Sequence, residues 1–153
     1  MKRAIALATG IFFIATLFSF NLMAETKSAK YLGKKENCID VVRIKESRIL
    51  DDQTILFQMR SGEFYLNRLP VRCVSLKIAG GFSYSTSIDK LCKQDLINVV
   101  QQSSAPSMTC SIGEFVEFKE KGTIDKIEKM LEDGLLKDLV AEGVFETAFP
   151  QKK

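Results

Sequence analysis

The chain has 153 residues, with 22 Lys and Arg, 19 Asp and Glu, and neither His nor Trp. The absence of His excludes Ser-His-Asp and Cys-His catalysis, His general bases and His-ligated metals. A chain of this length forms one domain with a sizeable core rather than two ordinary domains. We therefore expect a protein that is not an enzyme and holds no metal or other cofactor.

The first 24 residues have the three-part organisation of a secretory signal peptide, namely a positive start, an apolar run and a small residue. Lys2 and Arg3 precede an uncharged apolar run of 17 residues, and Ala24 stands at the expected cleavage point. An uncleaved anchor helix is the alternative, but this run is at the short limit for crossing a bilayer. We expect residues 1–24 to be removed after Ala24, leaving a periplasmic protein with no stable membrane anchor.

Four cysteines follow the leader, namely Cys38, Cys73, Cys92 and Cys110. In an oxidising compartment an even number of cysteines predicts disulfides, and no Cys-x-x-Cys pair indicates a redox or zinc site. Three pairings are possible. Cys38–Cys110 with Cys73–Cys92 is favoured, because it joins the first strand to a late one and closes a short middle loop.

Residues 25–37 are polar and Lys-rich, and they predict a flexible lead-in. Residues 38–119 then show short β-like runs separated by turn residues. Thr54–Met59 alternates Ile55, Phe57 and Met59 on one face, and Arg60-Ser61-Gly62 predicts a hairpin connection into the next strand.

The later part of the β region also consists of short β-like runs. Residues 82–87 alternate strictly, residues 96–100 predict an apolar strand, and residues 108–112 and 114–118 predict the last two strands. Residues 87–92 are interpreted as a helical turn. The fold class predicted is mainly β, a small antiparallel barrel or sandwich (OB-like or SH3-like) stapled by disulfides.

Residues 120–153 predict a C-terminal helical extension. Thr123 is the expected N-cap, Ile124, Ile127 and Leu131 share one face, and Gly134 interrupts the helix. The region 25–113 carries a net charge of +4 and 114–149 a net charge of −5. We expect the acidic helices to fold back on a mildly basic β region, which is too weakly basic for nucleic acid.

Candidate binding residues are the polar side chains of two predicted strands. They are Tyr65, Asn67, Arg68 and Tyr84. Exposed aromatics and an Arg on a small β domain can form a ligand face. The alternative is that both tyrosines are half-buried core residues with a solvated hydroxyl.

Two groups of residues suggest catalysis only weakly. Ser87-Ile88-Asp89-Lys90 matches a Ser-x-x-Lys pattern, but its companion motifs are missing, and a Ser cap is the simpler interpretation. Asp51 and Asp52 are adjacent, and a turn explains them better than an acid–base pair.

The stretch from Cys38 to Phe115 resembles a bacterial family of small exported domains of unknown function. The resemblance is carried by four segments with all four cysteines in register. They are residues 49–57, residues 65–69, Leu91-Cys92 with Asp95 and Ile97, and residues 110–115. It implies a compact disulfide-bonded β domain and brings no activity. Val74-Ser75 and the extension after Gly122 depart from the family pattern.

Three functions follow from the sequence as expectations. The first is a non-enzymatic envelope domain that binds a protein or other ligand. The second is a periplasmic lysozyme inhibitor, because Ser61-Gly62-Glu63-Phe64-Tyr65 is similar to the Ser-Gly-x-x-Tyr stretch of one inhibitor group. The third is a small hydrolase using Asp51, Asp52, or Ser87 with Lys90, which requires these groups to meet in one pocket.

Overall fold

The computed structural model describes residues 29–86, 88–100 and 108–145. The predicted signal peptide, its cleavage point at Ala24 and the candidate nucleophile Ser87 lie outside the described residues.

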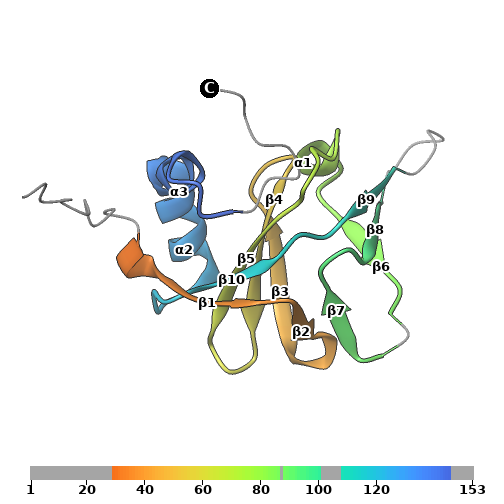
Figure 1. Ribbon diagram of the computed structural model, residues 1–153, viewed down its shortest axis with the longest axis horizontal. Helices are drawn as coiled ribbons and strands as arrows, with labels where there is room; N and C mark the ends of the chain where they lie inside the picture. The colour runs from red at the N-terminus through yellow and green to blue at the C-terminus, as the bar shows by residue number, and fades with distance from the viewer. Residues whose placement is uncertain (1–28, 87, 101–107, 146–153) are drawn as a thin grey trace, which may run out of the picture.

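A five-stranded antiparallel sheet forms the centre of the molecule (Figure 1). In spatial order its strands are β1 (Leu32–Glu36), β10 (Phe115–Phe118), β5 (Phe64–Arg68), β4 (Thr54–Met59) and β3 (Ile44–Ile49). The predicted hairpin between β4 and β5 is confirmed. Gly62 in its turn has a φ of 90°, a value that glycine adopts without a steric penalty.

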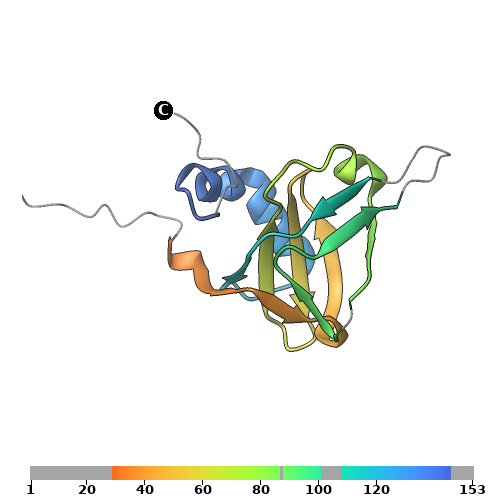
Figure 2. The same cartoon turned by 45° about the vertical axis from the view of Figure 1, so that its right-hand side comes forward.

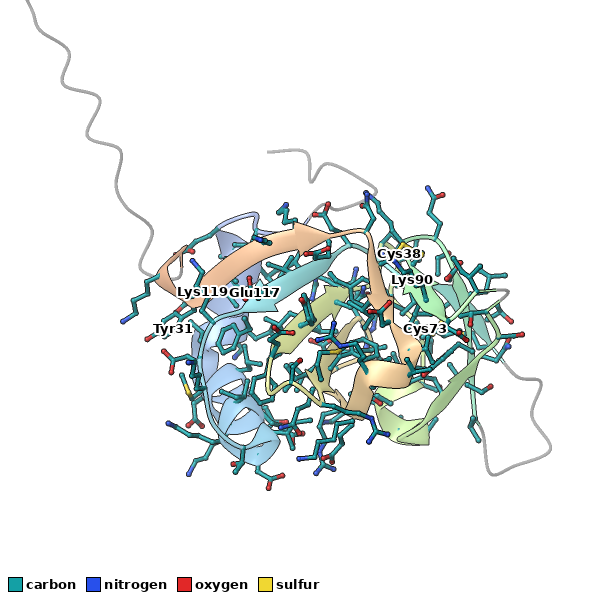
Figure 3. The ribbon with its side chains drawn as sticks, turned by 90° about the horizontal axis from the view of Figure 1, so that it is seen from below. Tyr31, Cys38, Cys73, Lys90, Glu117 and Lys119 are labelled. Atoms are coloured by element: carbon teal, nitrogen blue, oxygen red, sulfur yellow. A yellow bond between two sulfur atoms is a disulfide. The ribbon has the colours of Figure 1, made fainter. Side chains whose placement is uncertain are left out.

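A flexible lead-in was expected over residues 25–37, and strand β1 corrects this for residues 29–37, the part that the structure describes. Its sequence, Leu-Gly-Lys-Lys-Glu, has no apolar alternation, but its backbone pairs with β10, with Lys35 opposite Val116. Figure 3 shows Tyr31 near Glu117 and Lys119 along this edge, where the Lys119 amide donates to the Tyr31 carbonyl at 2.7 Å. The β domain therefore begins before Cys38.

Two smaller antiparallel sheets lie beside the central one. Strand β2 (Cys38–Asp40) pairs with β7 (Lys90–Cys92), and β8 (Leu96–Val99) lies between β6 (Phe82–Tyr84) and β9 (Thr109–Ser111). Strand β7 replaces the helical turn expected over residues 87–92. Its Leu91 is fully buried, which draws this segment into an extended pairing with β2.

The two C-terminal helices follow the predicted period, and three shorter helical segments were not predicted. The chain has short 3-10 turns at Ala29–Tyr31 and Val41–Arg43, a one-turn α1 (Leu76–Ala79), then α2 (Ile124–Met130) and α3 (Leu136–Ala141). Thr123 caps α2 as expected, because its side chain accepts a hydrogen bond from the Lys126 amide at 3.4 Å. A wide turn, Leu131–Leu135, joins α2 to α3, and Gly134 within it has a φ of 132°.

Hydrophobic cores lie on both faces of the central sheet. On one face Ile55, Phe57 and Met59 pack with residues of the smaller sheets, as their alternation predicted. On the other face Leu56, Leu66 and their neighbours pack against α2 and α3. Figure 2 shows the helices on one side of the central sheet and β6–β9 on the other. The mainly β, antiparallel fold with a C-terminal helical extension is confirmed, and its described strands form three open sheets.

Two disulfides are present, but the favoured pairing was wrong. Cys38 bonds to Cys92 and Cys73 bonds to Cys110, instead of Cys38–Cys110 and Cys73–Cys92. The register of β2 against β7 places Cys38 directly opposite Cys92, with their Cα atoms 4.0 Å apart. The second bond ties the segment before α1 to β9.

The acidic helices do fold back on basic residues of the β domain. Arg48 Nη2 lies 3.3 Å from Asp125 Oδ1, and Arg48 Nε lies 3.8 Å from Glu128 Oε2. Lys77 Nζ lies 3.5 Å from Glu132 Oε1. These pairs are partly exposed, so each contributes little by itself, and burial of the apolar helix face holds the layers together.

Candidate ligand-binding site

A cavity of about 610 Å³ lies between the helical extension and one end of the central sheet. Its apolar wall is formed by Leu50, Leu131, Leu136, Val140 and Ala141. Four charged residues complete the lining: Asp51, Arg68, Glu132 and Lys137. A mostly apolar concavity of this size with few polar groups is typical of small-molecule sites in proteins.

The break at Gly134 shapes this cavity. Leu131 lies before the break and is buried, while Leu136 and Val140 follow it and are only partly buried. A φ of 132° is unfavourable for residues with a Cβ, so glycine allows the helix to change direction here. As a result, apolar side chains from two helical segments face the ends of β3 and β5.

Arg68, at the end of β5, brings a positive charge to the cavity. Its Nη1 donates to the Thr54 hydroxyl at 2.9 Å and its Nη2 donates to Gln53 Oε1 at 3.0 Å. Both acceptors are neutral, and among the described residues no carboxylate forms an ion pair with this guanidinium. Its Nε is enclosed and has no hydrogen-bond partner there. The site therefore holds an Arg that is positioned but not neutralised.

The other lining charges are largely engaged elsewhere. Glu132 pairs with Lys77, outside the cavity. Asp51 Oδ1 accepts a hydrogen bond from the Gln53 amide at 2.6 Å, an Asx-type turn that confirms the turn interpretation of this residue. Lys137 is exposed at the rim.

Asn67 was predicted as a binding residue, and the structure gives it another role. It is fully buried on the opposite face of β5 from Arg68. Its side-chain amide donates to the Gly113 carbonyl at 2.8 Å and accepts from the Gly113 amide at 3.0 Å. Asn67 thus holds the connection between β9 and β10, and no ligand can reach it.

The two tyrosines are half-buried and lie apart from the cavity. Tyr65 lines a polar depression of about 200 Å³ together with Arg43, Glu63 and Lys90. Burial, and then the carboxylate of Glu63, raise the pKa of the Tyr65 hydroxyl above its ordinary value. Tyr84 packs against the core that contains Phe57, with its ring centroid 6.2 Å from that of Phe82. Burial raises the pKa of the Tyr84 hydroxyl as well. The four predicted binding residues therefore do not form one face.

The candidate hydrolase groups within the described residues, Asp51, Asp52 and Lys90, are also separated. Asp51 lines the helix–sheet cavity, whereas Lys90 lines the polar depression and lies near Cys38 (Figure 3). Asp52 is occupied by structural bonds, because its carboxylate accepts from Arg72 Nη2 at 2.9 Å and from the Lys77 amide at 3.0 Å. These contacts, the Lys77 amide first, lower the pKa of Asp52.

The Ser61–Tyr65 stretch, which prompted the inhibitor hypothesis, forms the β4–β5 hairpin. The Ser61 hydroxyl donates to Glu63 Oε2 at 3.0 Å and accepts from Arg43 Nη2 at 3.4 Å. Gly62 supplies the positive φ of the turn. Hairpin geometry therefore accounts for the Ser-Gly pair without a partner protein.

Sequence reasoning singled out two of the cavity residues, Arg68 as a binding residue and Asp51 as a hydrolase candidate. The helical residues of the wall were interpreted simply as a core face. The one usable signal was Gly134, since a glycine within an apolar helical pattern marks a change of direction.

Within the ranges that the structure describes, no cluster of three or more His, Cys, Asp or Glu side chains is placed to hold a metal ion. Nor is any helix there both long and apolar enough to cross a bilayer. Neither a family model, nor a curated protein, nor a solved structure matches the chain.

Proposed function

We propose that the protein is an exported, non-enzymatic binding domain of the cell envelope that takes a small amphipathic ligand into the helix–sheet cavity. Export is supported by the leader pattern of residues 1–24 and is compatible with two disulfides. The resemblance to small exported domains agrees with this proposal and adds no activity to it.

The cavity carries the proposal. About 610 Å³ falls within the usual range for ligand sites, and five apolar side chains line it beside one unneutralised Arg. Each methylene that leaves water in such a site contributes about 0.8 kcal/mol. An alkyl chain along the leucines therefore supplies affinity, and a polar head near Arg68 supplies orientation.

Binding is favoured over catalysis because the candidate reactive groups that the structure describes, Asp51, Asp52 and Lys90, have no shared site. Asp51 and Lys90 line different concavities, and Asp52 is held by Arg72 and Lys77. Catalysis requires such groups within hydrogen-bond reach of one substrate.

The test is direct binding of an apolar fluorescent probe, 8-anilinonaphthalene-1-sulfonate, to the folded, disulfide-bonded protein, followed by its displacement with 1-dodecanol. We expect saturable binding and competition. Val140→Trp fills the cavity and should weaken probe binding at least tenfold. Ile78→Trp adds the same side chain at a position that is 89% exposed on α1, and should leave binding unchanged.

Two results would overturn this proposal. One is that neither 8-anilinonaphthalene-1-sulfonate nor 1-dodecanol binds saturably. The other is equal affinity in the wild type, the Val140→Trp variant and the Ile78→Trp variant, because the probe would then bind elsewhere.

A further inference from the structure

We infer that the cavity selects a monoanionic amphiphile, a fatty-acid-like chain whose carboxylate is recognised by Arg68. This inference rests on the proposed function and adds the chemical class of the ligand. It depends on the charges around Arg68, which are independent of the apolar wall.

Arg68 retains unused hydrogen-bonding capacity. A guanidinium has five N–H donors, and within the described part of the chain Arg68 makes two bonds, to Thr54 and Gln53. Those two bonds fix the plane of the group, so it is oriented before any ligand arrives. A planar, pre-oriented guanidinium suits a carboxylate, which offers two coplanar acceptor oxygens.

The charge balance favours an anion over a neutral or cationic head. Arg68 has no carboxylate partner among the described residues, and Lys137 adds a second positive charge at the rim. Glu132 is paired with Lys77, which leaves Asp51 as the one unpaired acid of the lining. A cationic head would approach an unneutralised guanidinium, and like charges repel strongly where water is displaced.

The same balance limits the ligand to a single negative charge. The unpaired carboxylate of Asp51 lines the same cavity as Arg68, so the second negative charge of a dianionic phosphate head would meet a like charge there. A carboxylate brings one charge and matches the one guanidinium of the lining, whereas the Lys137 ammonium is exposed at the rim. The chain of such a ligand would then lie along Leu50, Leu131 and Leu136.

The experiment compares four ligands that share a twelve-carbon chain: dodecanoate, 1-dodecanol, dodecyltrimethylammonium and dodecyl phosphate. Because the chain has no Trp, Ala141→Trp at the cavity rim provides a single fluorescent reporter for all of them. Measurements are made at pH 8, below the aggregation concentration of each ligand. We expect dodecanoate to bind at least tenfold more tightly than dodecanol, and the cation to bind more weakly than dodecanol.

Arg68→Gln in the reporter background should bring dodecanoate to within twofold of dodecanol. Lys45→Gln removes one positive charge from β3 outside the cavity lining, and should preserve the tenfold preference. The ligand series on the Ala141→Trp reporter with Arg68 intact decides the inference even if Arg68→Gln does not fold.

The outcomes separate the two proposals. Equal binding of acid, alcohol and cation, or tighter binding of dodecyl phosphate than of dodecanoate, overturns the carboxylate assignment and leaves the cavity as an amphiphile site. No binding by any of the four overturns both.

Discussion

Asn67 provides the sharpest test of the fold, because one buried side chain satisfies both polar groups of one peptide residue. In Asn67→Ala the Gly113 amide and carbonyl lose their partners, at 3.0 and 2.8 Å, and both remain buried. A buried polar group left unsatisfied costs about 1–3 kcal/mol, so the two together cost about 4 kcal/mol. The Gly113 backbone cannot shift to find other hydrogen-bond partners, because it lies too close to the backbone of Arg68. The approach is so close that a Cβ at position 113 would collide with the Arg68 carbonyl.

The assay is urea unfolding with both disulfides intact. With an m-value of about 2 kcal/mol per molar urea, the midpoint should fall by about 2 M without a change in slope. Asn98→Ala is the matched control, because Asn98 is exposed on β8 and its side chain makes one surface hydrogen bond, from Thr109 Oγ1 at 2.7 Å. We expect that change to cost about 0.5 kcal/mol or less. If both variants unfold at the same urea concentration, Asn67 does not hold this connection.

Three further predictions concern the disulfides, Asp52 and the helix break. Peptide mapping without reduction should recover Cys38 with Cys92 and Cys73 with Cys110, and a Cys38–Cys110 peptide would contradict the structure. Loss of either bond should lower the free energy of unfolding by about 4 kcal/mol through loop-closure entropy. The pKa of Asp52 is lowered in the folded protein, so its contribution to folding stability is present above the unfolded pKa and is lost as pH falls through the folded pKa. Asp52→Asn should therefore flatten the pH dependence of the unfolding free energy below about pH 4. An unchanged pH dependence in this acidic range would count against these contacts. Gly134→Ala should cost about 1–3 kcal/mol through backbone strain alone, since its Cβ would meet no atom within 4 Å, and a thermal melt equal to the wild type would exclude that strain.

Local patterns predicted the parts of the fold in which side-chain burial follows chain periodicity. The alternation of Ile55, Phe57 and Met59 correctly placed one face of β4. Thr123 correctly marked the start of α2. Both signals arise within a few residues, so they can be recognised without knowledge of the tertiary structure.

The features that were missed depend on contacts distant in sequence. Strand β1 is polar and is held by backbone pairing to β10, which no pattern in Leu32–Glu36 reveals. The disulfides follow from strand register, whereas chain entropy differs little between the three possible pairings. Arg68 was singled out, but its cavity exists only because the helices beyond Gly122 fold back across the sheet.

The position of β10 has a consequence for how the chain folds. Of the described strands it is the last to be synthesised, yet it lies inside the central sheet, between β1 and β5. Until residue 118 is available, β1 has no neighbour to pair with and β5 has an open edge. The central sheet therefore cannot assemble progressively from its N-terminus, and its closure must await nearly the whole β domain. Topologies dominated by such distant contacts fold slowly, so a nascent chain would remain open until its C-terminal third emerged.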